Sequence, residues 1–155
     1  MDEMNVQVVT LPFMRYASGW AYGTEPEEEA WKKLQAWAKA KGLLEARGDF
    51  QPRVFGFDNP MSAMGTPNHG YEFWVTFEED REVQVEGDIR LGTFGGGLYA
   101  MMPLTITDPW KEIPAGWQRL DAWVHEHGRE MGSHQWLEEH DAEGHLKALY
   151  YALRG

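Results

Sequence analysis

Carboxylates inside aromatic segments are the side chains with the clearest chemical potential in this sequence. The segment 71–77 reads Tyr-Glu-Phe-Trp-Val-Thr-Phe, a composition typical of a β-strand. Because strand side chains alternate between two faces, Glu72, Trp74 and Thr76 share one face. A carboxylate beside an indole can bind an organic cation through its charge and the ring face. The alternative is a solvated glutamate on an exposed sheet face.

A second carboxylate, Glu138, alternates in the same way with Trp136 and His140. Two carboxylates that face one cleft repel each other, and one of them then has a raised pKa. Such a carboxyl group can bind a cation or act as a general acid or base. The alternative is a surface acidic run that includes Glu139 and Asp141.

Aromatic side chains near three consecutive glycines complete the candidate binding set. Tyr99 follows the glycines at 95–97, which allow the backbone to bend sharply or to approach a ligand. These glycines match neither GxGxxG nor GxxxxGK[ST], so they do not predict a phosphate-binding loop. Tyr99 can donate a hydrogen bond or stack on a ligand; the alternative is a half-buried strand tyrosine. Tyr16 and Trp20, in the aromatic segment 14–22, are further ligand-binding candidates.

The histidines do not form a recognised metal-binding motif. Five of the six lie in the last third of the chain, at positions 125, 127, 134, 140 and 145. On a helix, His125 and His127 would point their rings roughly 200° apart. The sequence contains neither an HExxH motif nor a GxSxG nucleophile elbow. We therefore predict no metal site and no cofactor.

A helix over residues 26–41 is the clearest element that could position these side chains. Thr24 and Glu27 have the spacing of a capping box, Pro26 suits a first helical turn, and Gly42 is a natural stop. A second helical stretch is predicted from Asp108-Pro109, restarting at Pro114, to Gly128. Strands are predicted at 6–11, 53–57, 71–77, 83–90 and 98–106, with short extended pieces near 135–140 and 146–153. The segment 14–22 is either a strand or a loop, and 61–70 reads as a loop.

The two helices share the pattern Trp-x-x-Leu-x-Ala-Trp, at 31–37 and at 117–123, and each is followed by a glycine. A tyrosine precedes each helix (Tyr16, Tyr99) and a glutamate follows it (Glu72, Glu138), which suggests an internal duplication. The alternative is that amphipathic helices converge on similar spacing. Duplication predicts an α+β fold of two βαββ repeats related by a pseudo-twofold axis. Its antiparallel sheet would carry the helices on one face, with a central ligand groove between the halves.

Composition limits the classes of function. The 155 residues, 43% of them hydrophobic, suit one globular domain over residues 1–155. A net charge of −11 without a basic stripe argues against direct nucleic-acid binding. The absence of cysteine excludes disulfides and thiolate chemistry. No basic-then-apolar leader and no apolar run of about 20 residues is visible, so we expect a cytoplasmic protein without membrane contact.

With these residues in view, the sequence resembles the GyrI-like family, the effector-binding domain of AraC-type and MerR-type regulators. The resemblance covers nearly the whole chain and rests on residues 8–12, Ala30-Trp31 with Leu34 and Trp37, and residues 53–60, 70–74, 96–100 and 137–139. It implies two βαββ units around a groove, in which multidrug-sensing members bind lipophilic cations through aromatics and a late-strand carboxylate. That carboxylate maps onto Glu138, and the family's Tyr-Glu strand maps onto Tyr71 and Glu72.

The resemblance also implies alternatives. Some stand-alone members resemble hydrolases of cyclopropane-bearing alkylators, for which Tyr99 with Glu138 or Glu72 would be the groove residues, and one member inhibits DNA gyrase. The sequence departs from the family in having His140 where many members have tyrosine. It carries no DNA-binding domain, so a regulatory role would need a separate regulator as partner. We expect a stand-alone protein that senses or sequesters aromatic, cationic lipophilic compounds. A hydrolase, a gyrase partner and a homodimer stay open.

Overall fold

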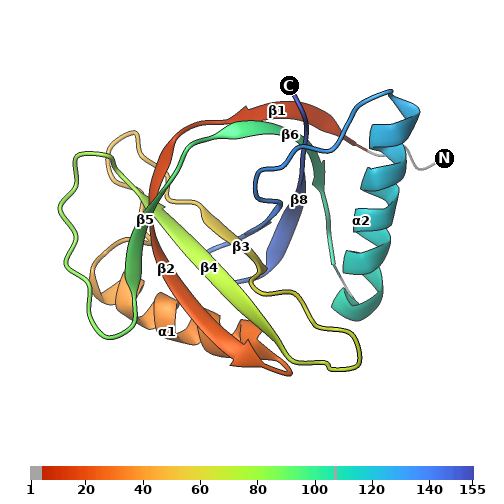
Figure 1. Cartoon of the computed structure of the whole chain (residues 1–155). Helices are drawn as coiled ribbons and strands as arrows, with labels where there is room; N and C mark the ends of the chain where they lie inside the picture. The colour runs from red at the N-terminus through yellow and green to blue at the C-terminus, as the bar shows by residue number, and fades with distance from the viewer. Residues whose placement is uncertain (1–4, 107) are drawn as a thin grey trace.

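The computed structural model describes residues 5–106 and 108–155, which form one curled sheet and two helices (Figure 1). The helices are α1 (Pro26–Ala40) and α2 (Pro109–Glu126). The eight strands are β1 (Gln7–Leu11), β2 (Met14–Gly23), β3 (Val54–Asp58), β4 (His69–Phe77), β5 (Arg90–Phe94), β6 (Gly97–Pro103), β7 (Leu137–His140) and β8 (Leu146–Ala152). They are antiparallel to their neighbours, in the order β1-β6-β8-β7-β3-β4-β2-β5.

The strand order confirms the α+β fold of two βαββ repeats. The repeats are β2-α1-β3-β4 and β6-α2-β7-β8, and β3 pairs with β7 where they meet. From this seam the sheet runs outward as β3-β4-β2-β5 on one side and as β7-β8-β6-β1 on the other. The edge strands are exchanged, because β1 precedes β2 in the chain but pairs with β6, while β5 precedes β6 but pairs with β2. Each half of the sheet is thus completed by a strand from the other half of the chain.

Both helices end as their glycines predict. Gly42 and Gly128 adopt left-handed φ values of 71° and 66°. The residue after each glycine donates its N–H to the carbonyl five positions earlier, at 2.9 and 3.0 Å, which is the Schellman arrangement. The two repeats therefore share their helix ends as well as their topology.

The start of α1 corrects one prediction. Its N-cap is Glu25, which makes no side-chain cap hydrogen bond, so the capping box between Thr24 and Glu27 is wrong. The Glu27 carboxylate instead approaches the imidazole of His69, with Oε2 2.7 Å from Nε2. Pro26 opens the helix as predicted. The spacing of Thr24 and Glu27 favours a capping box. The sheet instead brings His69 close to Glu27, and the Glu27 carboxylate contacts this imidazole.

The sheet has two distinct faces, and both helices lie on one of them. Trp31, Leu34 and Trp37 are buried between α1 and the first half of the sheet, while Leu120 is buried under α2 against the second half. We call this side the helix face. The opposite side, which we call the inner face, has its own core cluster around Trp74. Among the described residues, no helix is long and apolar enough to cross a membrane.

Glycine inside a strand explains why β5 was misplaced. The strand predicted at 83–90 is wrong, because β5 covers Arg90–Phe94 and most of 83–90 lies in the preceding loop. Gly92 of β5 lies opposite Tyr16 of β2, and a Cβ atom there would lie 2.6 Å from the tyrosine ring. The Tyr16 ring therefore requires glycine at position 92, and this glycine interrupts the alternation that predicts a strand. The segment left open at 14–22 is part of β2, and β6 ends at Pro103, short of the predicted 106.

Candidate functional site

Five of the predicted binding residues share the inner face. In the pairing of β2 with β4, Trp20 lies opposite Glu72 and Ser18 lies opposite Trp74. Tyr16 is on the same face of β2, two residues from Ser18. Tyr99, on β6 in the other half, packs into the same inner-face cluster as Trp74. The strand pairing therefore brings Tyr16, Trp20, Glu72, Trp74 and Tyr99 to one face of the sheet, whereas alternation in the sequence had predicted this only for Glu72 and Trp74.

Glu72 accepts hydrogen bonds from three neutral donors. The Ser18 hydroxyl and the Trp74 indole N–H donate to Oε2 at 2.9 and 2.7 Å. The Asn59 side-chain amide donates to Oε1 at 3.0 Å. In the described part of the chain no lysine, arginine or histidine forms an ion pair with Glu72. The carboxylate is half-buried and oriented, and its charge is not neutralised by a basic side chain.

Aromatic rings surround this carboxylate. The Tyr16 ring stacks on the Trp74 indole with centroids 4.0 Å apart, and Phe57 meets the same indole edge-on at 5.1 Å. Burial and the negative charge of Glu72 raise the pKa of Tyr16. Trp20 is 44% exposed, and its indole N–H donates to the Asn59 carbonyl at 2.6 Å. We call Tyr16, Trp20, Glu72 and Trp74 the Glu72 cluster.

Glu138 does not face Glu72, which corrects the central expectation of the sequence analysis. Glu138 lies opposite Gly56 in the β3–β7 pairing, so it points to the helix face. Although the residue is half-buried, its carboxyl group is enclosed, and it accepts hydrogen bonds from the Tyr71 hydroxyl at 2.5 Å and the Trp117 indole at 3.2 Å. Burial raises the pKa of Glu138. The repeat was matched out of step, since β7 is the counterpart of β3 and not of β4.

The other two candidates from the last third of the chain, His140 and Trp136, do not lie beside Glu72 either. His140 is buried on the helix face against Phe73, at a ring distance of 4.8 Å, and burial lowers its pKa to about 4. Trp136 packs between Trp117 and Tyr151, at centroid distances of 5.1 and 4.1 Å, and it also contacts the inner-face cluster. Glu138 and His140 therefore belong to the packing of the helix face, and Trp136 lies between the two clusters.

Glu139 is the inner-face carboxylate that sequence reasoning assigned to the surface. It lies opposite Phe55, is 5% exposed, and forms a two-point ion pair with Arg53 at 2.9 Å for each contact. The Tyr150 hydroxyl also donates to it at 2.6 Å. Burial alone would raise the pKa of Glu139, but the hydrogen bonds from Arg53 and Tyr150 and the charges of Arg53 and Lys147 together outweigh it, and the pKa is lowered. Because Glu139 is two residues from Leu137 in the same strand, the two share a face, and this alternation could have predicted that Glu139 points to the inner face.

Tyr99 lies on the inner face with its hydroxyl already engaged. The side chain is fully buried, and the hydroxyl donates to the Gln135 carbonyl at 2.5 Å. Burial raises the pKa of Tyr99. The residue therefore contributes to the aromatic core of the face rather than offering a free hydroxyl.

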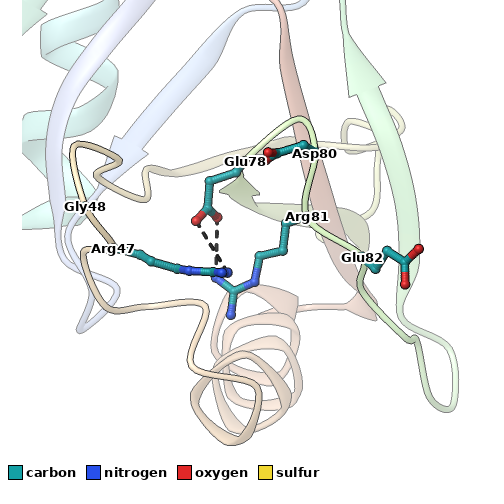
Figure 2. A pocket seen from close by; sticks show the side chains of 6 residues that line it. All are labelled: Arg47, Gly48, Glu78, Asp80, Arg81 and Glu82. Carbon is teal, nitrogen blue, oxygen red and sulfur yellow. Dashed lines mark hydrogen bonds and ion pairs between the residues drawn. The ribbon is translucent and has the colours of Figure 1, made fainter.

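Two surface hollows lie where β3 begins and β4 ends, and the second is lined in part by Thr76, which lies opposite Tyr16. One, of about 530 Å³, is lined by charged side chains, with Glu78 paired to Arg81 at 3.3 Å and to Arg47 at 3.7 Å (Figure 2). The second, of about 410 Å³, is lined by residues 12–14, Phe50, Gln51, Arg53 and 76–80. The charges of the first largely neutralise one another, and the acidic residues that line the second share it with the Arg53 guanidinium.

Comparison with known proteins agrees with this architecture. Residues 4–140 match the GyrI-like small molecule binding domain. The chain belongs to this family. The GyrI-like fold accounts for the two βαββ units, and the family description assigns binding of small molecules. No curated protein sequence matches the chain.

Solved structures share the GyrI-like fold at low sequence identity. A hydrolase from Listeria innocua is 12% identical, with a TM-score of 0.67 over 99% of this chain and 94% of that chain. The EcmrR C-terminal domain is 12% identical, with a TM-score of 0.66 over 97% of this chain and 98% of that chain. SAV2435 bound to tetraphenylphosphonium is 12% identical, with a TM-score of 0.62 over 98% of this chain and 95% of that chain. At these identities the likeness shows the fold.

Proposed function

We propose that this GyrI-like domain binds an aromatic organic cation on the inner face of its sheet, with Glu72 as the counter-charge. The observation that carries the proposal is the carboxylate of Glu72, held by three neutral donors beside the Trp74 indole and without a basic partner among the residues that the structure describes. A cation there gains both an opposite charge and an aromatic ring face. The net charge of −11 also favours approach of cations over anions.

The ion pair between Glu139 and Arg53 is the reason for proposing Glu72, and not Glu139, as the counter-charge. An organic cation at Glu139 would have to displace the Arg53 guanidinium from a two-point ion pair. At Glu72 it would replace no cation, because the three donors are neutral. The similar fold of SAV2435 bound to tetraphenylphosphonium supports a lipophilic cation as the class of ligand.

A hydrolase role has less support from the geometry. That hypothesis rested on a tyrosine and two acids converging on one cleft. Tyr99 lies on the inner face with its hydroxyl engaged, whereas Glu138 lies on the helix face. Tyr99 and Glu138 are therefore not brought together, and Tyr99, which shares the inner face with Glu72, has its hydroxyl engaged by the Gln135 carbonyl.

The test is a titration with tetraphenylphosphonium, followed by quenching of tryptophan fluorescence. Glu72→Gln should weaken binding by about tenfold or more, equivalent to about 1.4 kcal/mol. That is less than the roughly 4 kcal/mol between unit charges 4 Å apart in a partly buried setting. Glu28→Gln, at an exposed helix position, is the matched control and should bind like the wild type.

A ligand of opposite charge separates electrostatics from shape. Tetraphenylborate has nearly the same size and rings but is an anion, so the wild type should bind it far more weakly than tetraphenylphosphonium. Equal affinity for the two ions, or an unchanged affinity in Glu72→Gln, contradicts the proposal.

A further inference from the structure

Three metal-ligating side chains converge beside the N-terminus of α1, from elements distant in sequence. Glu27 lies in the first turn of α1, Asp58 is the last residue of β3, and His69 is the first residue of β4. One ligand atom from each residue lies within 4.8 Å of the others. The sequence predicted no metal site because no local motif joins positions 27, 58 and 69.

The imidazole of His69 is oriented as a ligand. Its Nδ1 lies 3.0 Å from the Pro67 carbonyl oxygen, so this nitrogen carries a proton and donates it there. Its Nε2 points to the carboxylate of Glu27. Metal-bound histidines commonly donate their second ring nitrogen to a carbonyl, which fixes the ring and directs the other nitrogen to the ion.

The two carboxylates lack basic partners other than this histidine. Within residues 5–106 and 108–155, no lysine or arginine forms an ion pair with Glu27 or Asp58. The neighbouring lysines of α1, Lys32 and Lys33, pair with Glu28 and Asp88 instead. Excess negative charge is thus concentrated where three ligand atoms meet.

The three side chains interact electrostatically, and although burial opposes it, hydrogen bonds to Glu27 and Pro67 and the charges of Glu27 and Asp58 raise the pKa of His69. Desolvation raises the pKa of Asp58; His69 opposes this, and the charge of Glu27 adds to it. The pKa of Glu138 is raised mainly by burial and further by the charges of Asp58 and Glu27. A divalent cation would relieve the repulsion between the two carboxylates.

We propose that Glu27, Asp58 and His69 bind one divalent transition-metal ion, of which Zn²⁺ is the best match. Zinc accepts imidazole nitrogen and carboxylate oxygen, and three protein ligands leave a fourth position for water. Mg²⁺ and Ca²⁺ prefer oxygen ligands throughout, so the imidazole selects against them. Ligand bonds of about 2.0–2.2 Å place tetrahedral donor atoms about 3.4 Å apart. The Glu27 and His69 ligand atoms, 2.7 Å apart, would have to separate to reach this value, and all the ligand atoms lie within 4.8 Å of one another.

Isothermal titration calorimetry of the whole chain with zinc chloride tests the proposal, without any organic cation present. The wild type should bind one zinc ion per chain. His69→Gln and Asp58→Asn should each weaken binding by about tenfold or more, at least the loss seen when a supporting residue of a metal site is removed. Magnesium chloride in excess should not displace the zinc.

A matched histidine variant separates this site from adventitious surface binding. His125 lies 3.5 Å from Asp121 on an exposed helix face, so His125→Gln removes a comparable imidazole–carboxylate pair. It should retain zinc binding at full affinity. The proposal is overturned if the wild type binds no zinc, if His69→Gln and Asp58→Asn bind like the wild type, or if His125→Gln causes the same loss.

Thermal unfolding supplies a second readout that does not depend on heats of binding. Excess zinc should raise the Tm of the wild type and of His125→Gln, because an ion that binds the folded state alone stabilises it. The Tm of Asp58→Asn should not respond. Equal zinc-induced shifts in all three proteins would also overturn the proposal. Comparing the metal-free proteins by circular dichroism shows that the variants fold.

Discussion

Tyr16 and Trp74 stack face to face on the inner face of the sheet, with ring centroids 4.0 Å apart and an interplanar angle of 12°. A ligand ring that stacked on the same face of the indole would have to take the place of the Tyr16 ring. The hydroxyl-bearing ring of Tyr16 thus occupies the surface where an aromatic cation beside Glu72 would stack. Binding at the Glu72 cluster therefore requires Tyr16 to move aside.

Removing the Tyr16 ring should strengthen binding of tetraphenylphosphonium. An aromatic stack contributes roughly 0.5–1.5 kcal/mol beyond area burial, so Tyr16→Ala should improve affinity by about 2- to 10-fold. Fluorescence titration measures the change, with Tyr22→Ala, at a tyrosine that is 53% exposed, as control. Weaker binding by Tyr16→Ala would mean that the ring contacts the ligand rather than competing with it.

Glu138→Gln should leave the affinity for tetraphenylphosphonium unchanged, because Glu138 lies on the helix face. The same variant should be as stable as the wild type or more stable at pH 7. A carboxyl group whose pKa is raised on folding costs stability above that pKa, and glutamine removes the cost. Urea unfolding at pH 7 and pH 4 measures this, and the advantage should shrink at pH 4. A tenfold loss of ligand affinity would restore the sequence-based assignment of Glu138.

Arg53→Met should destabilise the fold through Glu139. The Glu139 carboxylate would remain buried with the Tyr150 hydroxyl and the Lys147 ammonium group, 3.9 Å away, as partners. Breaking a fully buried pair costs roughly 3–5 kcal/mol. Because the Arg53 side chain is 33% exposed, we expect about 2–3 kcal/mol. Urea denaturation gives the value, and a loss below about 0.5 kcal/mol would show that the pair contributes little.

Protonation of His140 should weaken the fold in mild acid. Burial lowers its pKa from 6.5 to about 4, so the unfolded chain takes up this proton first as the pH falls. Stability present above pH 6.5 is therefore lost between pH 6.5 and about 4, by about 3 kcal/mol in total. His140→Asn should flatten this part of the stability curve, whereas His127→Asn, at an exposed histidine, should not. Parallel curves for the three proteins would rule out this assignment.

The helices and the duplication could be predicted because their signals are local and strong. The Trp-x-x-Leu-x-Ala-Trp pattern identified both helices and the side that faces the sheet, and the following glycines identified their ends. Alternation in 71–77 correctly placed Glu72 and Trp74 on one face, opposite to the α1 cluster.

The errors arose where the outcome depends on pairing between strands distant in sequence. In the short strand β7, Glu138 and Glu139 are adjacent acids, and only the register against β3 decides which one faces inward. Strand β5 was obscured by Gly92, whose absence of a side chain is required by the Tyr16 ring from another strand. The convergence of Glu27, Asp58 and His69 likewise depends on three elements meeting in space.

The most direct test of the central claim is a crystal structure of the protein with tetraphenylphosphonium bound. We predict that the cation lies on the inner face, with a phenyl ring against Trp74, the phosphonium centre beside the Glu72 carboxylate, and Tyr16 turned away from its present stack. A cation found instead in the 410 Å³ hollow beside Arg53, or beside Glu138 on the helix face, would contradict the assignment of Glu72 as the counter-charge.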